Sequence, residues 1–333
     1  MASLGIALAL TFAAGSASAE RLDVRIGTAS LTGVYFAAGN AVCRVLERRF
    51  GRDMKCEVLE TGGSGANVEL LSSGKVNFAI MQSDVLASSF IGDKGPRGVA
   101  ALYPEIFQVV YRKSLNIDVA AELMQHPFNI GLQGSGTRRT LNALLETLNF
   151  STDDFAAPVE MHAGKEAAAF CDGEIDGFAF VSGVPNSKIA QVIRECGAGI
   201  VGFTRRNMAT FVDARPGYSY FRFRKNAYDG MDRTVDTFAV MAILVAGHGT
   251  PDGLVRIVAE SLLDDIDYFE RLHPAWSELL GPDMATNIDR ALMHPAAGAD
   301  LYRTGHHQRV NPAALPRADC NGCRGGNAVM CLH

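Results

Sequence analysis

The chain has 333 residues, about twice the length of an ordinary domain, so two lobes are expected. A hydrophobic fraction of 48% with 20% charged residues is typical of a globular protein with a sizeable core. A net charge of −5 gives no support for nucleic-acid binding, and no such partner is expected.

Residues 1–19 are predicted to be a secretory signal peptide. The segment is apolar and uncharged, and it ends in the small-x-small pattern Ala17-Ser18-Ala19, which is typical of a cleavage site. It is short for a membrane span, and no later stretch is long and apolar enough to be one. A buried first helix is the alternative. The mature protein is expected to begin near Glu20, outside the cytoplasm.

Three short apolar runs in residues 24–84 each stop at a small polar loop and are followed by a helix-compatible run. The apolar runs are Val24 to Ile26, Cys56 to Leu59 and Val76 to Met81. Strand, loop and helix in threefold repetition predict a parallel sheet with its loops along one edge. The expected helices are Gly33 to Phe50, Asn67 to Ser73 and Asp84 to Ile91.

The loops of this series are rich in Ser, Thr and Asp, which are favoured helix N-caps. Each loop would present unpaired backbone N–H groups and the positive end of a helix. Three such ends along one edge predict a site for a small anion.

Two strands, Gly98 to Leu102 and Phe107 to Tyr111, are expected next, joined by a turn at Tyr103-Pro104-Glu105. A second series begins near Ser114 and has its own loop, Gln133 to Thr137, before a strong helix that ends at Leu148. Gly134 and Gly136 let the backbone approach a ligand closely.

The remaining segments complete the two lobes. A helix is expected at Val119 to Gln125, and strands are expected at Phe128 to Leu132 and Gly177 to Val181. The aromatic segment Phe203 to Tyr228 is interpreted as packing its rings against a sheet, in preference to forming a ligand-stacking surface. Val235 to Val245 leads back to the first lobe. The predicted domains are 20–113 with 236–305 for lobe 1, 114–235 for lobe 2, and a poorly ordered tail, 306–333.

Seven cysteines leave at least one unpaired within the chain. Export permits disulfides, and Cys171 with Cys196 is the predicted structural bridge. Cys43 and Cys56 could also meet; buried thiols are the alternative for both pairs. In the tail, Cys320, Cys323 and Cys331 with His333 could bind zinc, but a disulfide or loose thiols are favoured. No metal or cofactor is expected.

Enzyme signatures are absent from the sequence. It has no G-x-S-x-G elbow, Walker A loop, G-x-G-x-x-G or H-E-x-x-H motif. A secreted hydrolase with Ser64 or Ser135 as nucleophile needs a nearby histidine that the sequence does not promise. The protein is therefore not expected to be an enzyme.

Several motifs together resemble the TAXI group of solute receptors, the extracytoplasmic "immunogenic" proteins associated with TRAP transporters. They are Ile26-Gly27-Thr28, Thr32-Gly33-Val34-Tyr35, Thr61-Gly62-Gly63-Ser64 with Asn67, Gln82-Ser83-Asp84, Leu102 to Glu105, Gly134 to Thr137, Val181 to Asn186, Thr237-Phe238 and His294-Pro295. The resemblance implies a periplasmic binding protein of type II, an α/β fold with two lobes and a hinge. It implies a small carboxylate or amino acid such as glutamate or 2-oxoglutarate as ligand, and a TRAP permease as partner. A ligand sensor with the same fold is the alternative.

The expected ligand site lies between the lobes, where backbone amides and hydroxyls hold a carboxylate and Tyr35 covers the carbon chain. Arg138 and Arg139 are candidates to neutralise its charge. The predicted ligand-binding residues are Ser30, Thr32, Tyr35, Ser64, Asn67, Gln82, Ser83, Ser135, Gly136, Thr137 and Val181.

Overall fold

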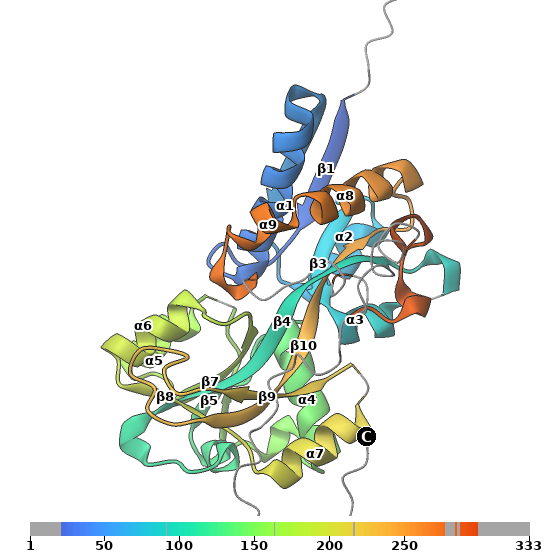
Figure 1. The fold of residues 1–333 in the computed structure, drawn as a ribbon. Helices are drawn as coiled ribbons and strands as arrows, with labels where there is room; N and C mark the ends of the chain where they lie inside the picture. Colours follow the sequence, from blue (N-terminus) through green and yellow to red (C-terminus); the bar gives the residue numbers. More distant parts are fainter. Residues whose placement is uncertain are drawn as a thin grey trace, which may run out of the picture.

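The computed structural model describes residues 21–90, 92–162, 164–215, 217–276, 284 and 287–298. These residues form two lobes that two long strands join (Figure 1). The predicted signal peptide and the cysteine-containing tail lie outside the described residues. No helix within the described ranges is long and apolar enough to cross a membrane.

The first lobe is built on a parallel sheet. Strand β1 (Leu22–Gly27) pairs in parallel with both β2 (Met54–Leu59) and β3 (Phe78–Gln82). A helix follows each strand, and these are α1 (Val34–Phe50), α2 (Ser64–Ser72) and α3 (Ser83–Ser89). The threefold strand–loop–helix repeat predicted from the sequence is therefore confirmed.

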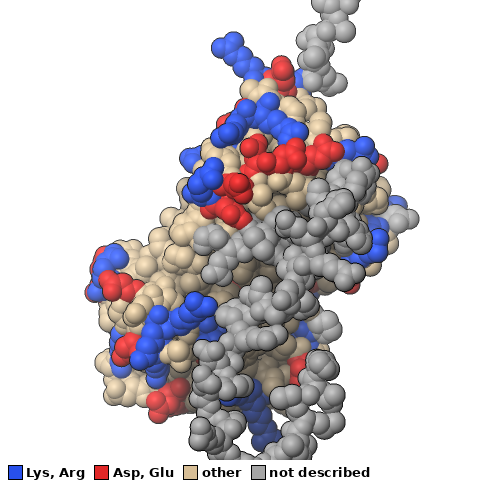
Figure 2. Space-filling model, viewed as in Figure 1, with Lys and Arg blue, Asp and Glu red and all other residues tan. Residues whose placement is uncertain are grey.

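Two later helices, α8 (Asp252–Asp264) and α9 (Ile266–Glu270), return to the first lobe and pack against α1. The predicted apolar side of α1 is buried, with Ala38, Val42, Val45 and Leu46 at 0% exposure. At the surface, Arg48 and Arg49 pair with Asp265 and Asp264, and acidic and basic side chains lie side by side on the upper lobe in Figure 2. Such exposed pairs contribute little, so the apolar side holds α1 in place.

The second lobe has a parallel trio of strands, β5 (Pro127–Asn129), β6 (Ala157–Val159) and β7 (Gly177–Ser182). Strands β8 (Ala198–Val201) and β9 (Ser219–Phe223) extend the sheet. Its helices are α4 (Gly136–Thr147), α5 (Glu166–Asp172), α6 (Ser187–Glu195) and α7 (Arg205–Ala214). A 3₁₀ segment, Ala120–Gln125, stands where a helix was expected.

The lobes are joined by β4 (Arg97–Arg112) and β10 (Val235–Ala246), which pair with each other in antiparallel orientation. Strand β10 reaches β3 at one end and β9 at the other, whereas β4 continues to β7 and β8. Both strands therefore run through both lobes (Figure 1). The predicted lobe boundaries remain a prediction. They fall within or at the ends of β4 and β10, and these two strands belong to both lobes.

The turn expected at Tyr103-Pro104-Glu105 is wrong. Pro104 pairs with Met241 inside the continuous strand β4. It lies two residues before Ile106, where β7 first pairs with β4, and two residues after Leu102, which has no partner in β10 because Tyr103 pairs with Ala242 and Ala101 with Ile243. A residue without an N–H group is tolerated at such an irregular position of a sheet.

Aromatic rings fill the second lobe around β10. The ring of Phe238, at 0% exposure, lies 4.4 Å from that of Phe211, 4.8 Å from Phe107 and 5.6 Å from Tyr218, measured between centroids. Phe211 and Tyr218 belong to the segment that was expected to pack its rings against a sheet, and this interpretation is confirmed.

Both cysteine pairs form disulfides. Cys171–Cys196 connects α5 to the end of α6, as predicted, and Cys43–Cys56 connects α1 to β2. The second bridge holds α1 against β2, and the loop that follows β2 reaches the space between the lobes.

Candidate functional site

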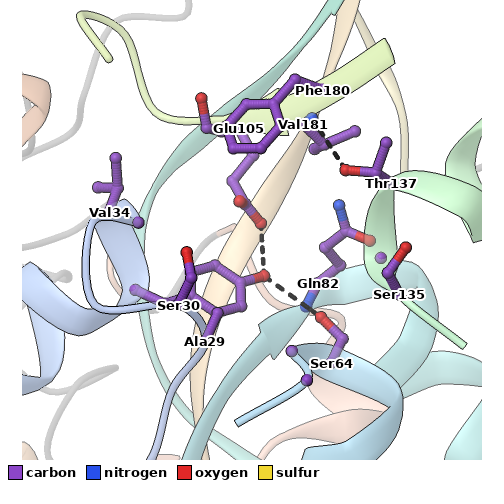
Figure 3. A pocket seen from close by; sticks show the side chains of 16 residues that line it. Ala29, Ser30, Val34, Ser64, Gln82, Glu105, Ser135, Thr137, Phe180 and Val181 are labelled. Carbon is purple, nitrogen blue, oxygen red and sulfur yellow. Dashed lines mark hydrogen bonds between the residues drawn. The ribbon is translucent and has the colours of Figure 1, made fainter. Parts of the chain in front are cut away.

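A cavity between the two lobes encloses about 530 Å³ of empty space, part of it open to solvent (Figure 3). The loops after β1 and β2, the end of β3, the middle of β4, the start of α4 and the end of β7 supply its walls. The lining residues are Ala29, Ser30, Gly33, Val34, Tyr35, Gly62, Gly63, Ser64, Gln82, Glu105, Ser135, Gly136, Thr137, Phe180, Val181 and Ser182.

Eight of the eleven predicted ligand-binding residues line this one cavity: Ser30, Tyr35, Ser64, Gln82, Ser135, Gly136, Thr137 and Val181. They come from both lobes, although up to about 150 residues of sequence separate them. The structure brings them together because the carboxyl ends of the parallel strands in each lobe face the other lobe.

The other three predicted residues lie elsewhere. Asn67 is fully buried below the loops, where its Nδ2 donates to the carbonyl oxygens of Thr28 and Ile80, both at 2.8 Å. The Ser83 hydroxyl accepts a hydrogen bond from the Met241 amide at 3.3 Å. Thr32 is exposed and faces a separate groove. Asn67 and Ser83 therefore hold the loops and strands in position, and none of the three is part of the cavity wall.

Three helices of eight or more residues begin at the cavity wall. Their N-cap residues are Gly33 for α1, Gly63 for α2 and Ser135 for α4. Only Ser135 provides a side-chain cap, with its hydroxyl accepting from the Arg138 amide at 3.1 Å. The expectation of Ser, Thr or Asp caps is wrong for α3, whose N-cap is Gln82, and for α1 and α2, whose N-caps are glycines. Because glycine offers no capping oxygen, the first N–H groups of these helices remain available to a bound group.

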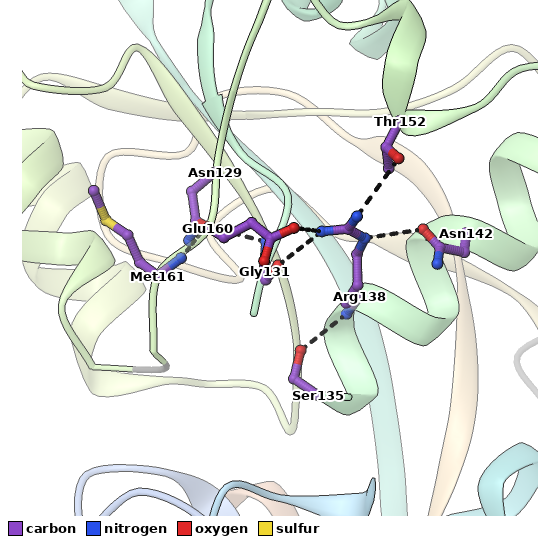
Figure 4. Close-up of polar contacts among 8 residues, drawn as sticks. All are labelled: Asn129, Gly131, Ser135, Arg138, Asn142, Thr152, Glu160 and Met161. Atoms are coloured by element: carbon purple, nitrogen blue, oxygen red, sulfur yellow. Dashed lines mark hydrogen bonds and ion pairs between the residues drawn. The ribbon is translucent and has the colours of Figure 1, made fainter. Parts of the chain in front are cut away.

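The two arginines considered as charge partners do not line the cavity. Arg138 donates to Glu160 at 2.7 Å, to Asn142 at 3.1 Å and to the carbonyl of Gly131 at 3.2 Å (Figure 4). Arg139 pairs with Asp84, with 3.4 Å between Nε and Oδ2. Among the described residues that form the wall there is no Lys, Arg or His. Backbone dipoles are thus the positive groups that face the cavity.

Glu105 is the main functional candidate that the sequence reasoning missed. It lies on β4, its side chain faces the cavity, and the residue is 3% exposed. The Tyr35 hydroxyl donates to its Oε2 at 2.6 Å (Figure 3). Burial raises the pKa of the Glu105 carboxyl to about 8, opposed by the Tyr35 bond and reinforced by the charge of Asp84. A charged residue inside the apolar run from Gly98 to Tyr111 was the signal that could have found it.

Ser64 also lines the cavity and lies beside Tyr35. Its hydroxyl accepts from the Gln82 amide at 3.2 Å and lies 3.4 Å from the Tyr35 hydroxyl. Burial and the neighbouring Glu105 raise the pKa of Tyr35 well above its usual range, so Tyr35 is a neutral donor. Within the described part of the chain, no three His, Cys, Asp or Glu side chains are grouped to hold a metal ion.

The lobes touch directly beside the cavity. A Cβ atom placed on Gly65 of α2 would lie 2.2 Å from the carbonyl oxygen of Gly134, and one on Gly136 would lie 2.5 Å from Gln82 Oε1. Nearby, the Tyr218 hydroxyl donates to Asp84 at 2.7 Å. These contacts between residues of the two lobes show that the structure has the cavity closed on this side.

Two α/β lobes, two connecting strands and a cavity between facing loops give the chain the fold of type II periplasmic binding proteins. The chain belongs to the NMT1-like family, whose model matches residues 26–302.

Solved structures resemble the chain at low sequence identity. A Streptococcus mutans structure on glutathione import via GshT and the cystine ABC importer TcyBC has a TM-score of 0.52 and 10% identity, covering 77% of this chain and 94% of that one. The alkanesulfonate-binding protein SsuA of Xanthomonas axonopodis pv. citri, bound to MOPS, has a TM-score of 0.45 and 15% identity, covering 87% and 85%. The first likeness supports the fold alone.

Proposed function

We propose that this protein is an extracytoplasmic solute-binding receptor that captures a small carboxylate or amino acid, similar in size to glutamate or 2-oxoglutarate. The observation that supports it is the convergence of three helix N-termini, two without side-chain caps, on one cavity between the lobes. Backbone N–H groups at helix N-termini bind carboxylates without a cationic side chain.

Ligand binding would close the two lobes around the solute. The wall residues come from both lobes, so a ligand makes its full set of contacts only in the closed form. It therefore shifts the equilibrium toward closure by its differential affinity for the two forms. The strands β4 and β10 are the segments that would bend.

The proposed partner is the permease of a TRAP transporter, and the proposed location is the periplasm. The motifs shared with TAXI receptors and the apolar N-terminal segment support both. Solute uptake into proteoliposomes that requires both the permease and this protein would test the partnership. Binding without uptake would favour the alternative role as a ligand sensor.

Thermal unfolding with a panel of dicarboxylates, oxoacids and amino acids tests the ligand class. A ligand at 100 times its Kd adds about 2.7 kcal/mol to the stability of the folded state. The absence of a shift with every small acid would contradict the proposal.

A pair of N-cap variants provides a matched control. Ser135→Ala removes the cap of α4 at the cavity, whereas Thr204→Ala removes the cap of α7 outside it. Each should cost about 1 kcal/mol of stability. Only Ser135→Ala should also reduce the ligand-induced shift, because only its hydroxyl faces the ligand.

A secreted hydrolase has no support from the geometry. Neither Ser64 nor Ser135 has a histidine beside it among the described wall residues. We therefore propose binding without turnover.

A further inference from the structure

We infer that Glu105 is a specificity-determining residue that receives the ammonium group of the ligand, so that the cavity selects acids that also carry a primary amine. The inference rests on the proposed function, since it assumes that a small acid occupies this cavity. It goes further by distinguishing an amino acid from the matching oxoacid.

The first argument is the hydrogen-bonding state of Glu105. Tyr35 donates to Oε2, and no donor of the described residues is bonded to Oε1. An ammonium group offers three donors, and one of them can bond to this free oxygen. The unbonded oxygen of Glu105 therefore matches the chemistry of an amine.

The second argument is the charge around Glu105. The titratable groups that face it are Tyr35 from α1, Tyr103 from β4 itself and Asp84 from α3. None of them is a cation, and the described wall residues include no Lys, Arg or His. A positive group of a ligand would favour the ionised form of Glu105, whereas a second carboxylate would favour its protonated form.

The third argument is the separation of donors and acceptors in the cavity. The N–H groups of α1, α2 and α4 lie along the loops at the wall, and the carboxyl group of Glu105 lies on β4. A molecule with a carboxylate and an ammonium group can satisfy both sets at once. An oxoacid brings no cation to Glu105, so it lacks this ion pair and binds more weakly than the matching amino acid.

Glutamate and 2-oxoglutarate are a suitable probe pair, because they differ only in the amine or oxo group on one carbon. Isothermal titration calorimetry should show tighter binding of glutamate by the wild type, by about 10- to 100-fold for a hydrogen bond to a charged group. Glu105→Gln keeps the size of the side chain but removes its charge, and it should abolish most of this preference. Glu160→Gln, which alters the carboxylate paired with Arg138 outside the cavity, is the control and should keep it.

Several outcomes would overturn the inference. They are equal binding of the two acids, preference for 2-oxoglutarate, or an unchanged preference in Glu105→Gln. If neither these acids nor any other small acid binds, the proposed function itself fails. If 2-oxoglutarate binds well and glutamate does not, the proposed function stands and the inference fails.

A measurement on the wild type alone is independent of any variant. Because the pKa of Glu105 in the empty cavity is about 8, the carboxyl is mostly protonated at pH 7. Pairing with an ammonium group requires the ionised form, so glutamate should release up to about one proton on binding. Titrations in two buffers of different ionisation enthalpy measure this number. No release, or uptake of a proton, would contradict the inference.

Discussion

Gly65 is expected to set how closely the two lobes can approach each other. In Gly65→Ala, the new Cβ would lie 2.2 Å from the carbonyl oxygen of Gly134. This oxygen belongs to backbone and cannot rotate away, so the lobes must separate by about 1.2 Å to restore the 3.4 Å at which ordinary contact begins. Forced contacts of this kind cost about 1–3 kcal/mol, and the closed form alone would bear the cost. The ligand affinity should therefore fall by about 5- to 150-fold.

The assay for this prediction separates closure from folding. Alanine is favoured over glycine inside a helix, so the ligand-free variant should lose little stability. Titration calorimetry should show the weaker binding, and small-angle X-ray scattering should show less compaction with ligand. Gly253→Ala in α8, outside the cavity, is the control, because no atom lies within 4 Å of its new Cβ. Wild-type affinity and compaction in Gly65→Ala would refute the reasoning.

Three further predictions concern stability. Because the pKa of Glu105 is raised, the folded state keeps a proton that the unfolded state releases above about pH 4.5. The free energy of unfolding should therefore decrease between about pH 4.5 and about pH 8, by about 1.4 kcal/mol per pH unit at most. Denaturant titrations of Glu105→Gln should lack this slope, and an equal slope in the variant would contradict the assignment. Replacing Cys171 and Cys196 by alanine opens a loop of 25 residues and should lower the free energy of unfolding by about 3.5 kcal/mol through chain entropy. Urea unfolding measures this loss, and reductant should cause no further loss from this pair in the variant. Phe238→Ala removes the ring at the centre of the aromatic cluster and should cost about 3–5 kcal/mol, and a calorimetric loss below 1 kcal/mol would show that the cluster is dispensable.

Local patterns were sufficient to predict most of the first lobe. The alternation of apolar run, small polar loop and helix determines parallel pairing, and β1, β2 and β3 follow it. The same patterns placed Ser64 and Ser135 in loops at strand ends. Because such loops face each other across the two lobes, both residues line one cavity. Such features depend on residues close in sequence, which is why they can be derived from one chain.

The centre of β4 could not be derived in this way. Pro104 in isolation indicates a turn, and its place in a strand depends on β10, whose residues lie more than 130 positions later. The same misreading concealed Glu105 by assigning it to a turn. Likewise, Arg138 was expected near the ligand because it follows the loop at Ser135, but Glu160 and Asn142 hold its guanidinium elsewhere. Such side-chain contacts, which the pattern of residue types does not specify, decide the orientation of each side chain.

The order of strands also determines when the first lobe can be completed during biosynthesis. Strand β10 lies between β3 and β4, and every residue of β3 is buried once it is in place. Until residue 246 has left the ribosome, β3 has an unprotected apolar edge, and such an edge is prone to pairing with other chains. An N-terminal fragment that ends before β10 therefore has no finished first lobe to fold into.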